Sequence, residues 1–375
     1  MVSSKFLVLI CTFAVSLLLA FYAERWIIGL AYRRHYFDSH SERKIHKGDV
    51  PRLGGIIFFP VSVLMLIASA IFSLHMKEIN VSPVEISKGL GVVGAMFIMF
   101  IIGLVDDFKG VRYAKKFIGQ ILAGLLLCLS GLWIQDLHGL FWLHELSPWV
   151  GWPLTIFAII FVINAFNFID GIDGLAGSVS SIGLCYYACF SYLSGKWLFS
   201  LLSVVMLACV LPYLYYNLTG TSKAKTKIFM GDTGSTILGL VLASLGIMLT
   251  GSELGHQENS VRCAVPLMIG LAPLVYPCYD TVRVVLHRVR MGSSPFQADK
   301  NHFHHKLLTF GMSQRKALLT INGISITLII IMVLASLIMS INWVLVISLV
   351  LWFLINVILT KLNNNKSNIT KNDEN

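Results

Sequence analysis

Long apolar runs alternate with short polar segments along almost the whole chain. A helix needs about 20 apolar residues to cross a bilayer, and the runs of roughly that length lie near residues 5–24, 53–75, 89–105, 117–134, 151–168, 175–194, 197–216, 233–250, 263–281, 317–340 and 343–360. The pattern predicts an all-α, polytopic integral membrane protein with about eleven transmembrane helices in one domain, residues 1–360. A polar cytoplasmic tail, residues 361–375, is predicted to be disordered.

The composition supports a membrane protein. Hydrophobic residues make up 56% of the 375 residues and charged residues only 13%, whereas soluble proteins carry about 25% charged residues. The seven cysteines lie almost all in apolar runs and form no CxxC pair, which indicates packing residues rather than a disulfide framework or a zinc site.

The basic residues predict the orientation of the helices. If the N-terminus lies outside, 24 of the 29 lysines and arginines fall in cytoplasmic segments. Cytoplasmic loops are enriched in such residues, so we expect an external N-terminus and a cytoplasmic C-terminus. The net charge of +10 then reflects topology, and no nucleic-acid partner is expected. The first run resembles a signal peptide but lacks a small-residue cleavage site, so we interpret it as a retained span.

Five polar clusters fall on the predicted cytoplasmic face. They lie in residues 50–55, 103–108, 164–177, 229–235 and 294–305. The topology was derived from lysine and arginine, so the gathering of aspartate, asparagine and histidine on one face is a partly independent result. It predicts one site at the cytoplasmic surface of the membrane.

The stretch 164–177 is the densest of these clusters. It reads Asn-Ala-Phe-Asn-Phe-Ile-Asp-Gly-Ile-Asp-Gly-Leu-Ala-Gly and separates two apolar runs. Asp170 and Asp173 would share one face if the turn were helical, and Gly171 and Gly174 allow a close approach of backbone or ligand. Buried carboxylates are costly unless they are paired or hold a metal. A simple capped turn is the alternative, but it requires fewer such residues.

The residue types indicate phosphoryl transfer. Carboxylates without cysteines favour Mg²⁺, or Mn²⁺, over zinc, and Mg²⁺ commonly completes its shell with substrate phosphates and water. Lysine, arginine and helix N-termini bind phosphates. Metal and cations together can spread the charge of a phosphate that is being displaced. Since the site lies at the lipid boundary, one substrate can be a lipid.

Most of the clusters are not specific when taken alone. Asp106 and Asp107 could end a helix in water, and Asp232 could be an ordinary helix N-cap. Arg52 could contact lipid headgroups from a tight turn. The three histidines near residue 304 could lie in a solvated loop, and their spacing does not indicate zinc. Only the stretch 164–177 and the joint order of the clusters are specific.

That order resembles the polyprenyl-phosphate N-acetylhexosamine-1-phosphate transferases. These bacterial membrane enzymes begin surface glycans such as lipopolysaccharide O-antigen and cell-wall polymers. The resemblance covers roughly residues 25 to 310. It rests on the stretch 164–177 and on Pro51-Arg52-Leu53-Gly54-Gly55, Val105-Asp106-Asp107, Phe229-Met230-Gly231-Asp232-Thr233-Gly234-Ser235 and His302-Phe303-His304-His305. One departure is Asp38-Ser39-His40, where the family pattern is Asp-x-Pro.

The resemblance implies a reaction and a location. A UDP-HexNAc, most simply UDP-GlcNAc because of the Arg-Leu-Gly-Gly and His-x-His-His patterns, would react with undecaprenyl phosphate. The products would be undecaprenyl-diphosphate-HexNAc and UMP, and Mg²⁺ would be the cofactor. The enzyme would be a multi-pass protein of the bacterial inner membrane with its site facing the cytoplasm. A homodimer is compatible with the sequence.

The resemblance also implies roles for individual residues. The catalytic set would be Asp106, Asp107, Asp170, Asp173 and Asp232, with Asp232 and Asp107 as metal ligands and Asp106 in a base-like role. The substrate-binding set would be Lys47, Arg52, Asn167, Asn217, Phe229, His302, His304 and His305, with Phe229 stacked on uracil.

Two other functions remain open at this stage. One is the phospho-MurNAc-pentapeptide transferase reaction of peptidoglycan synthesis, which is the same chemistry with another donor. The other is a cation-coupled membrane transporter, but transporters commonly place carboxylates near the bilayer midplane between repeated halves. Here the carboxylates are predicted at one face, and the chain shows no internal repeat. An inactive scaffold would leave the five clusters unexplained.

Overall fold

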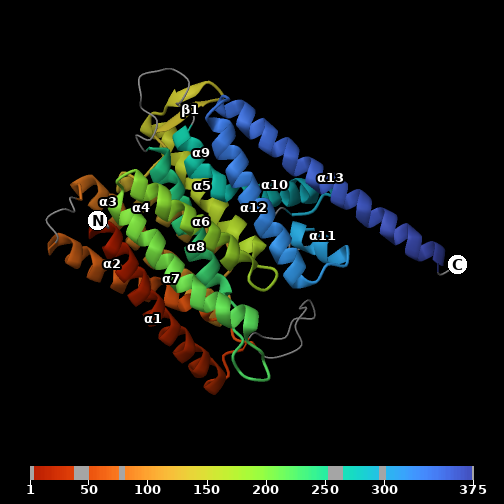
Figure 1. Cartoon of the computed structure of the whole chain (residues 1–375), viewed down its shortest axis with the longest axis horizontal. Helices are drawn as coiled ribbons and strands as arrows, with labels where there is room; N and C mark the ends of the chain where they lie inside the picture. Colours follow the sequence, from red (N-terminus) through yellow and green to blue (C-terminus); the bar gives the residue numbers. More distant parts are fainter. Residues whose placement is uncertain (1–3, 38–49, 76–80, 252–264, 295–300, 374–375) are drawn as a thin grey trace.

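The computed structural model describes residues 4–37, 50–75, 81–251, 265–294 and 301–373. The chain folds into a helical bundle with one small β-hairpin (Figure 1). The elements are α1 (Ser4–Arg33), η1 (Gly54–Ile57), α2 (Phe58–His75), α3 (Pro83–Lys109), α4 (Tyr113–Leu129), β1 (Asp136–Leu140), β2 (Leu143–Glu145), α5 (Pro148–Ile169), α6 (Leu175–Leu193), α7 (Trp197–Thr219), α8 (Gly231–Thr250), α9 (Val265–Leu271), η2 (Ala272–Leu274), α10 (Val275–Arg290), α11 (Phe303–Thr309), α12 (Gln314–Ser336) and α13 (Ile341–Asp373).

The helix α8 forms the centre of the bundle. All of its apolar span is buried inside the protein, and it packs against α3, α5, α6 and α9. Small residues make this close packing feasible. A Cβ atom at Gly239 would lie 2.7 Å from Cα of Ile163, and one at Gly246 would lie 2.7 Å from the carbonyl oxygen of Gly270. The start of α8 is therefore a fixed point for the polar residues around it.

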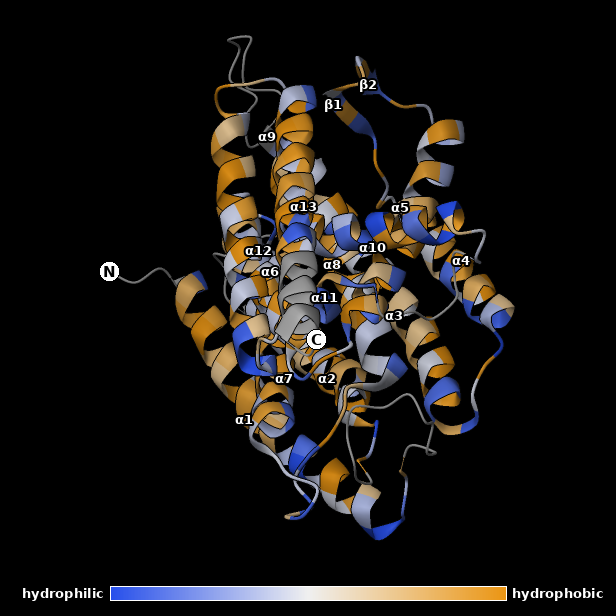
Figure 2. Ribbon diagram, turned by 90° about the vertical axis from the view of Figure 1, so that its right-hand side faces the viewer, coloured by the Kyte–Doolittle hydropathy of each residue, from blue (hydrophilic) through white to orange (hydrophobic). Residues whose placement is uncertain are grey.

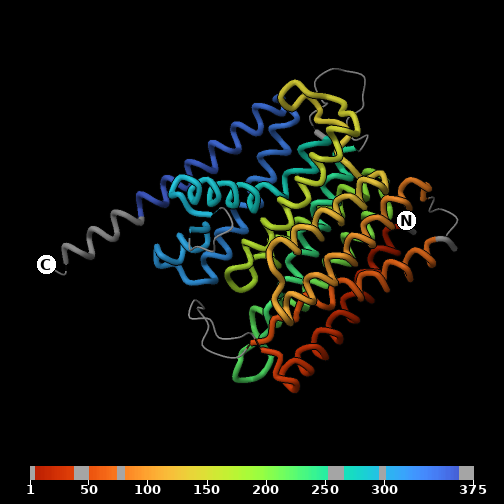
Figure 3. Tube along the Cα trace, turned by 180° about the vertical axis from the view of Figure 1, so that it is seen from behind, coloured from red at the N-terminus to blue at the C-terminus, as the bar shows by residue number. Residues whose placement is uncertain are grey.

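The remaining helices surround α8, and α7 packs against both α6 and the N-terminal helices α1 and α2. The N-terminal helices α1 to α3 lie on one side and α12 and α13 on the other, with the middle of the chain between them (Figures 1 and 3). Apolar residues cover much of the outer helices (Figure 2). Large apolar side chains such as Leu18, Ile67 and Phe353 are exposed, which is the surface expected of helices that face lipid.

The predicted spans all correspond to helices, but two of them are marginal. Among the described residues, nine helices are long and apolar enough to cross a membrane. The predicted spans near 117–134 and 175–194 correspond to α4, which has only 17 residues, and to α6, which contains four serines. The structure confirms an all-α polytopic membrane protein, whereas the number eleven and the orientation remain predictions.

Two segments differ from the sequence prediction. Residues 136–145, which the predicted all-α fold leaves as a connection between the spans 117–134 and 151–168, form an antiparallel hairpin. Asn342 anchors this hairpin by accepting from Phe141 N and donating to Gly139 O. The helix α13 continues to Asp373, where a disordered tail was predicted from residue 361. Helix propagation adds one hydrogen bond for each residue fixed, so a long apolar helix can extend into a polar segment.

We predict that Gly239→Ala destabilises the protein. The new methyl group would meet the backbone of α5 at Ile163, which cannot move as a side chain can, and overpacking of this kind costs about 1–3 kcal/mol. Gly323→Ala in α12 is the matched control, because no atom lies within 4 Å of a Cβ there. Thermal melting in detergent should show a lower Tm for Gly239→Ala and an unchanged or higher Tm for Gly323→Ala. Equal Tm values would contradict the tight packing of α8.

Candidate active site

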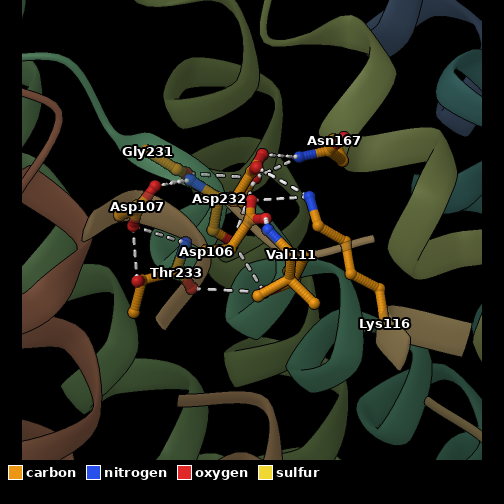
Figure 4. Close-up of polar contacts among 10 residues, drawn as sticks. Asp106, Asp107, Val111, Lys116, Asn167, Gly231, Asp232 and Thr233 are labelled. Carbon is orange, nitrogen blue, oxygen red and sulfur yellow. Dashed lines mark hydrogen bonds and ion pairs between the residues drawn. The ribbon is translucent and has the colours of Figure 1, made fainter. Parts of the chain in front are cut away.

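The carboxylate of Asp107 holds the first turn of α8 (Figure 4). Ser82 caps the start of α3 by accepting from Glu85 N, and α3 then runs to Lys109, which places Asp106 and Asp107 on its last turn. Oδ1 of Asp107 accepts from Asp232 N over 2.7 Å, and Oδ2 accepts from N and Oγ1 of Thr233 over 3.0 and 2.5 Å. The backbone amides at a helix N-terminus attract negative charge.

Lys116 bridges two other carboxylates of the site. Its Nζ lies 2.6 Å from Oδ2 of Asp106 and 2.9 Å from Oδ2 of Asp232. Oδ1 of Asp106 accepts from Val111 N over 2.6 Å. Lys116 lies on the first turn of α4. The short connection between α3 and α4 places this lysine beside Asp106 on the last turn of α3. Two carboxylates from distant segments thus converge on one cation.

Asn167 connects the stretch 164–177 to this cluster. Its Nδ2 donates to Oδ1 of Asp232 over 2.6 Å and to Oγ of Ser235 over 2.9 Å. One turn earlier on α5, Asn164 donates to Gln120 Oε1 and to Ile160 O. Both oxygens of Asp232 therefore accept hydrogen bonds, and its position on the first turn of α8 is fixed from two sides.

The segment 51–55 pairs with the segment before α8. Gly54 N donates to Phe229 O, Gly55 N donates to Met230 O, and Phe229 N donates to Pro51 O, over 2.8–3.0 Å. Only glycine fits at position 231: its φ is +76°, and a Cβ there would lie 2.2 Å from Arg52 O and 2.8 Å from both carboxylate oxygens of Asp107.

An open cavity of about 530 Å³ lies beside this cluster. Its walls include Arg52, Asp106, Asp107 and Asp232 together with His35–Phe37 at the end of α1. Arg52 is exposed at the wall of this cavity and adds a positive charge beside the carboxylates. The volume is in the range of pockets for small molecules.

The two aspartates of the stretch 164–177 have different surroundings. Residues 170–174 form a non-helical turn, so the helical arrangement in which Asp170 and Asp173 would share one face is not present. Asp173 forms an ion pair of 2.6 Å with Lys227. Asn217, predicted to bind substrate, is buried, accepts from Gly174 N and donates to Ile228 O. Asn217 therefore fixes the turn in this structure.

Asp170 retains its proton more strongly than a free aspartate. Burial raises the pKa of the Asp170 carboxyl to about 7, and the negative charge of Asp232 adds to the increase. A pKa near neutrality is common at functional sites, where carboxylates are clustered. Asp170 can thus change its charge when a cation or a phosphate binds nearby.

The residues 301–305, called the histidine loop below, lead into and begin the short helix α11 and contact the same turn through His304. His304 is 1% exposed, and among the described residues neither of its ring nitrogens has a hydrogen-bond partner. A Cβ at Gly171 would lie 2.3 Å from Nε2 of His304, so the glycine makes room for the ring. Burial lowers the pKa of His304 to about 3, and its neighbour His305 contributes. His304 is therefore neutral at pH 7 and can donate from only one nitrogen.

The structure brings all five predicted clusters together. Hydrogen bonds connect the segments 51–55, 106–107, 164–177 and 229–235, and the contact of His304 with Gly171 adds the histidine loop. Phe229 joins this arrangement through its backbone and is partly exposed. Lys47 lies outside the described residues. The assigned catalytic, metal-binding and substrate-binding roles remain predictions.

Sequence reasoning missed three charged residues. Lys116 and Lys227 were counted only for topology, yet each forms an ion pair inside the site. Asp280 was not noticed, although it is fully buried and binds His302. The signal for Asp280 was present, because an acidic residue within a predicted span marks a functional-site candidate. The two lysines gave no such signal, since their partners are ten or more residues away in the chain and could not be identified from spacing.

We predict that Asp170→Asn flattens the pH dependence of stability. Because its pKa is raised from 3.8 to about 7, the folded protein keeps a proton that the unfolded chain has lost. Asp170 therefore lowers stability as the pH rises from about 4 to 7, and asparagine mimics the neutral form. Melting at pH 5 and pH 8 should show a smaller fall in Tm for the variant than for wild type. An identical fall would contradict the raised pKa.

Comparison with known proteins places this geometry in a family. A profile of glycosyl transferase family 4 matches residues 89–250. The chain is 31% identical to a probable undecaprenyl-phosphate N-acetylglucosaminyl 1-phosphate transferase of Bacillus subtilis, over 86% of this chain and 83% of the relative. It is 30% identical to a decaprenyl-phosphate N-acetylglucosaminephosphotransferase of Mycolicibacterium smegmatis, over 81% and 76%.

A third relative is the undecaprenyl-phosphate alpha-N-acetylglucosaminyl 1-phosphate transferase of Escherichia coli, with 28% identity over 84% of this chain and 79% of the relative. The profile match contains Asp106, Asp107, the stretch 164–177 and Asp232, which are the residues that meet at the start of α8. The chain belongs to glycosyl transferase family 4 and is a membrane-bound glycosyl-1-phosphate transferase.

Proposed function

We propose that the protein transfers GlcNAc-1-phosphate from UDP-GlcNAc to undecaprenyl phosphate and releases UMP. The observation that carries the proposal is the convergence of Asp106, Asp107 and Asp232 on the first turn of a buried helix, beside an open cavity. The names of the relatives support an N-acetylglucosaminyl phosphate donor and a polyprenyl-phosphate acceptor. The abundance of lysine and arginine on one face supports an active site on the cytoplasmic side of the inner membrane.

The residues present fit a magnesium ion. Lys116 shows that a cation can lie between Oδ2 of Asp106 and Oδ2 of Asp232. Within the described residues, no group of three or more histidine, cysteine or acidic side chains forms a complete metal site. Mg²⁺ commonly needs only one or two protein carboxylates, with substrate phosphates and water as the other ligands. When bound, the ion would neutralise charge on the diphosphate of the donor.

Asp232 is the better placed of the two predicted metal ligands. Its side chain is 33% exposed and lines the cavity. Asp107 instead accepts three hydrogen bonds from the start of α8, which fit a role in holding Asp232 in place. In this interpretation Asp106 and Asp232 would hold the ion, with Lys116 displaced toward the phosphates.

The reaction does not require a strong base. An oxygen of the acceptor phosphate attacks the phosphorus that carries GlcNAc, the bond from that phosphorus to the bridging oxygen breaks, and UMP leaves. The second pKa of a phosphate monoester is about 6, so the nucleophile is largely ionised at neutral pH. The protein then has to align two anions and offset their repulsion, which Lys116 and Arg52 are placed to do. A base-like role for Asp106 is unnecessary.

A donor comparison tests the proposed function. Purified protein in detergent would receive undecaprenyl phosphate, Mg²⁺ and either UDP-GlcNAc, UDP-GalNAc or UDP-MurNAc-pentapeptide. We expect UMP release and a lipid-linked sugar with UDP-GlcNAc, and loss of both when the lipid is omitted or EDTA is added.

Preferential use of UDP-MurNAc-pentapeptide would replace the proposed donor with that of peptidoglycan synthesis. UMP release without lipid acceptor would contradict the transfer reaction. Absence of UMP with every donor, from a protein that melts cooperatively and elutes as one species, would contradict the proposed function as a whole.

A further inference from the structure

Asp280 is a fully buried acid outside the carboxylate cluster. It lies on α10, within an apolar span, and is 0% exposed. Burial of an ionised carboxylate is costly unless other groups compensate its charge and hydrogen-bonding capacity. The mechanism above gives Asp280 no task, so its contacts need an explanation.

Among the described residues, the carboxylate of Asp280 contacts Arg283 on the same helix and the beginning of the histidine loop. Oδ2 of Asp280 lies 2.9 Å from Nδ1 of His302. The amide of the next residue, Phe303, donates to both carboxylate oxygens over 3.1 and 3.2 Å. Arg283, one turn along α10, donates to Oδ1 over 2.7 Å and also to Asn301 O over 2.5 Å. The ion pair of Asp280 and Arg283 thus fixes three consecutive residues of the histidine loop, residues 301–303, to α10.

The chemistry of these contacts determines the state of the His302 ring. The guanidinium of Arg283 lies 2.7 Å from Oδ1 of Asp280 and favours the ionised carboxylate, which can only accept hydrogen bonds. The Nδ1 nitrogen of His302 then carries a hydrogen that it donates to this carboxylate, and in the neutral ring Nε2 is the nitrogen left for a ligand. The ring plane is also constrained, because it is nearly parallel to that of His304 at 5.8 Å and lies 6.1 Å from the ring of Phe168.

We propose that Asp280 is a positioning residue that fixes the tautomer and orientation of His302, so that Nε2 faces the phosphate groups of the bound substrates. This inference rests on the proposed function, because the ligand of His302 is taken to be a phosphate of the donor or the acceptor. The arrangement parallels the outer carboxylates that orient histidines at metal sites, whose mutation typically reduces activity 10–100-fold.

The proposal distinguishes Asp280 from a residue that only stabilises the fold. If Asp280 acts through His302, its loss should matter only while His302 is present. A carboxamide at position 280 can still accept from Phe303 N, but its own NH₂ group can donate to Nδ1 and stabilise the opposite tautomer. Asp280→Asn should therefore lower kcat more than it raises KM.

The first measurement is a double-mutant cycle with Asp280→Asn, His302→Gln and the combined variant. Each would be assayed for UMP release, with melting and size-exclusion elution as folding checks. Asp136→Asn is the matched control, because Asp136 also lies beside a histidine, His138, but belongs to the hairpin at the far end of α4. We expect a 10–100-fold lower kcat for Asp280→Asn, no further loss in the combined variant, and wild-type activity for Asp136→Asn.

The second measurement does not depend on activity. Nitrogen NMR of wild-type protein with ¹⁵N-labelled histidine, assigned by the signal that His302→Gln removes, should show a protonated Nδ1 on His302. A protonated Nε2 with a bare Nδ1 would overturn the proposal, as would losses that multiply in the double-mutant cycle. If wild-type protein releases no UMP, the proposed function fails while the nitrogen spectrum still decides the role of Asp280.

Discussion

The hydrogen bonds between Asp107 and the first turn of α8 are the interaction on which the site depends. The central helix presents unpaired amides at its N-terminus, and in an apolar bundle such amides need a partner. Asp107 satisfies two of them and the hydroxyl of Thr233, which connects the end of α3 to the start of α8. Asp232 follows immediately, so the same contact determines where its carboxylate lies. The close approach also explains why a glycine precedes Asp232.

The other charges of the site are arranged around this fixed point. Lys116 offsets Asp106 and Asp232, Lys227 offsets Asp173, and Arg283 offsets Asp280. The two lysines join segments that carry different parts of the predicted site, whereas Arg283 and Asp280 lie one turn apart on α10. The same contacts therefore stabilise the fold and arrange the charges of the site. A cluster of paired carboxylates and lysines is suited to a cation and two phosphate-bearing substrates. A bound cation can replace a lysine beside the carboxylates, and the lysine can then pair with a phosphate.

The sequence predicted the helices and the meeting of the five clusters well, because apolar length and the distribution of lysine and arginine reflect the bilayer directly. It predicted individual contacts poorly. Asp170 and Asp173 would share one face only in a helical turn, but the turn is non-helical, and Asp173 pairs with Lys227. The hairpin at 136–145 depends on Asn342, about 200 residues later. Such long-range partners leave no local pattern.

The most direct test of the central claim is UMP release by Asp232→Asn, which keeps the shape of the side chain and removes its charge. The account predicts a loss of at least about 100-fold, as for other removed electrostatic contacts at reacting groups. Melting and elution should remain unchanged, and Asp136→Asn should retain wild-type activity. Activity within about twofold of wild type in folded Asp232→Asn would contradict the claim that the carboxylate at the start of α8 is the centre of the active site.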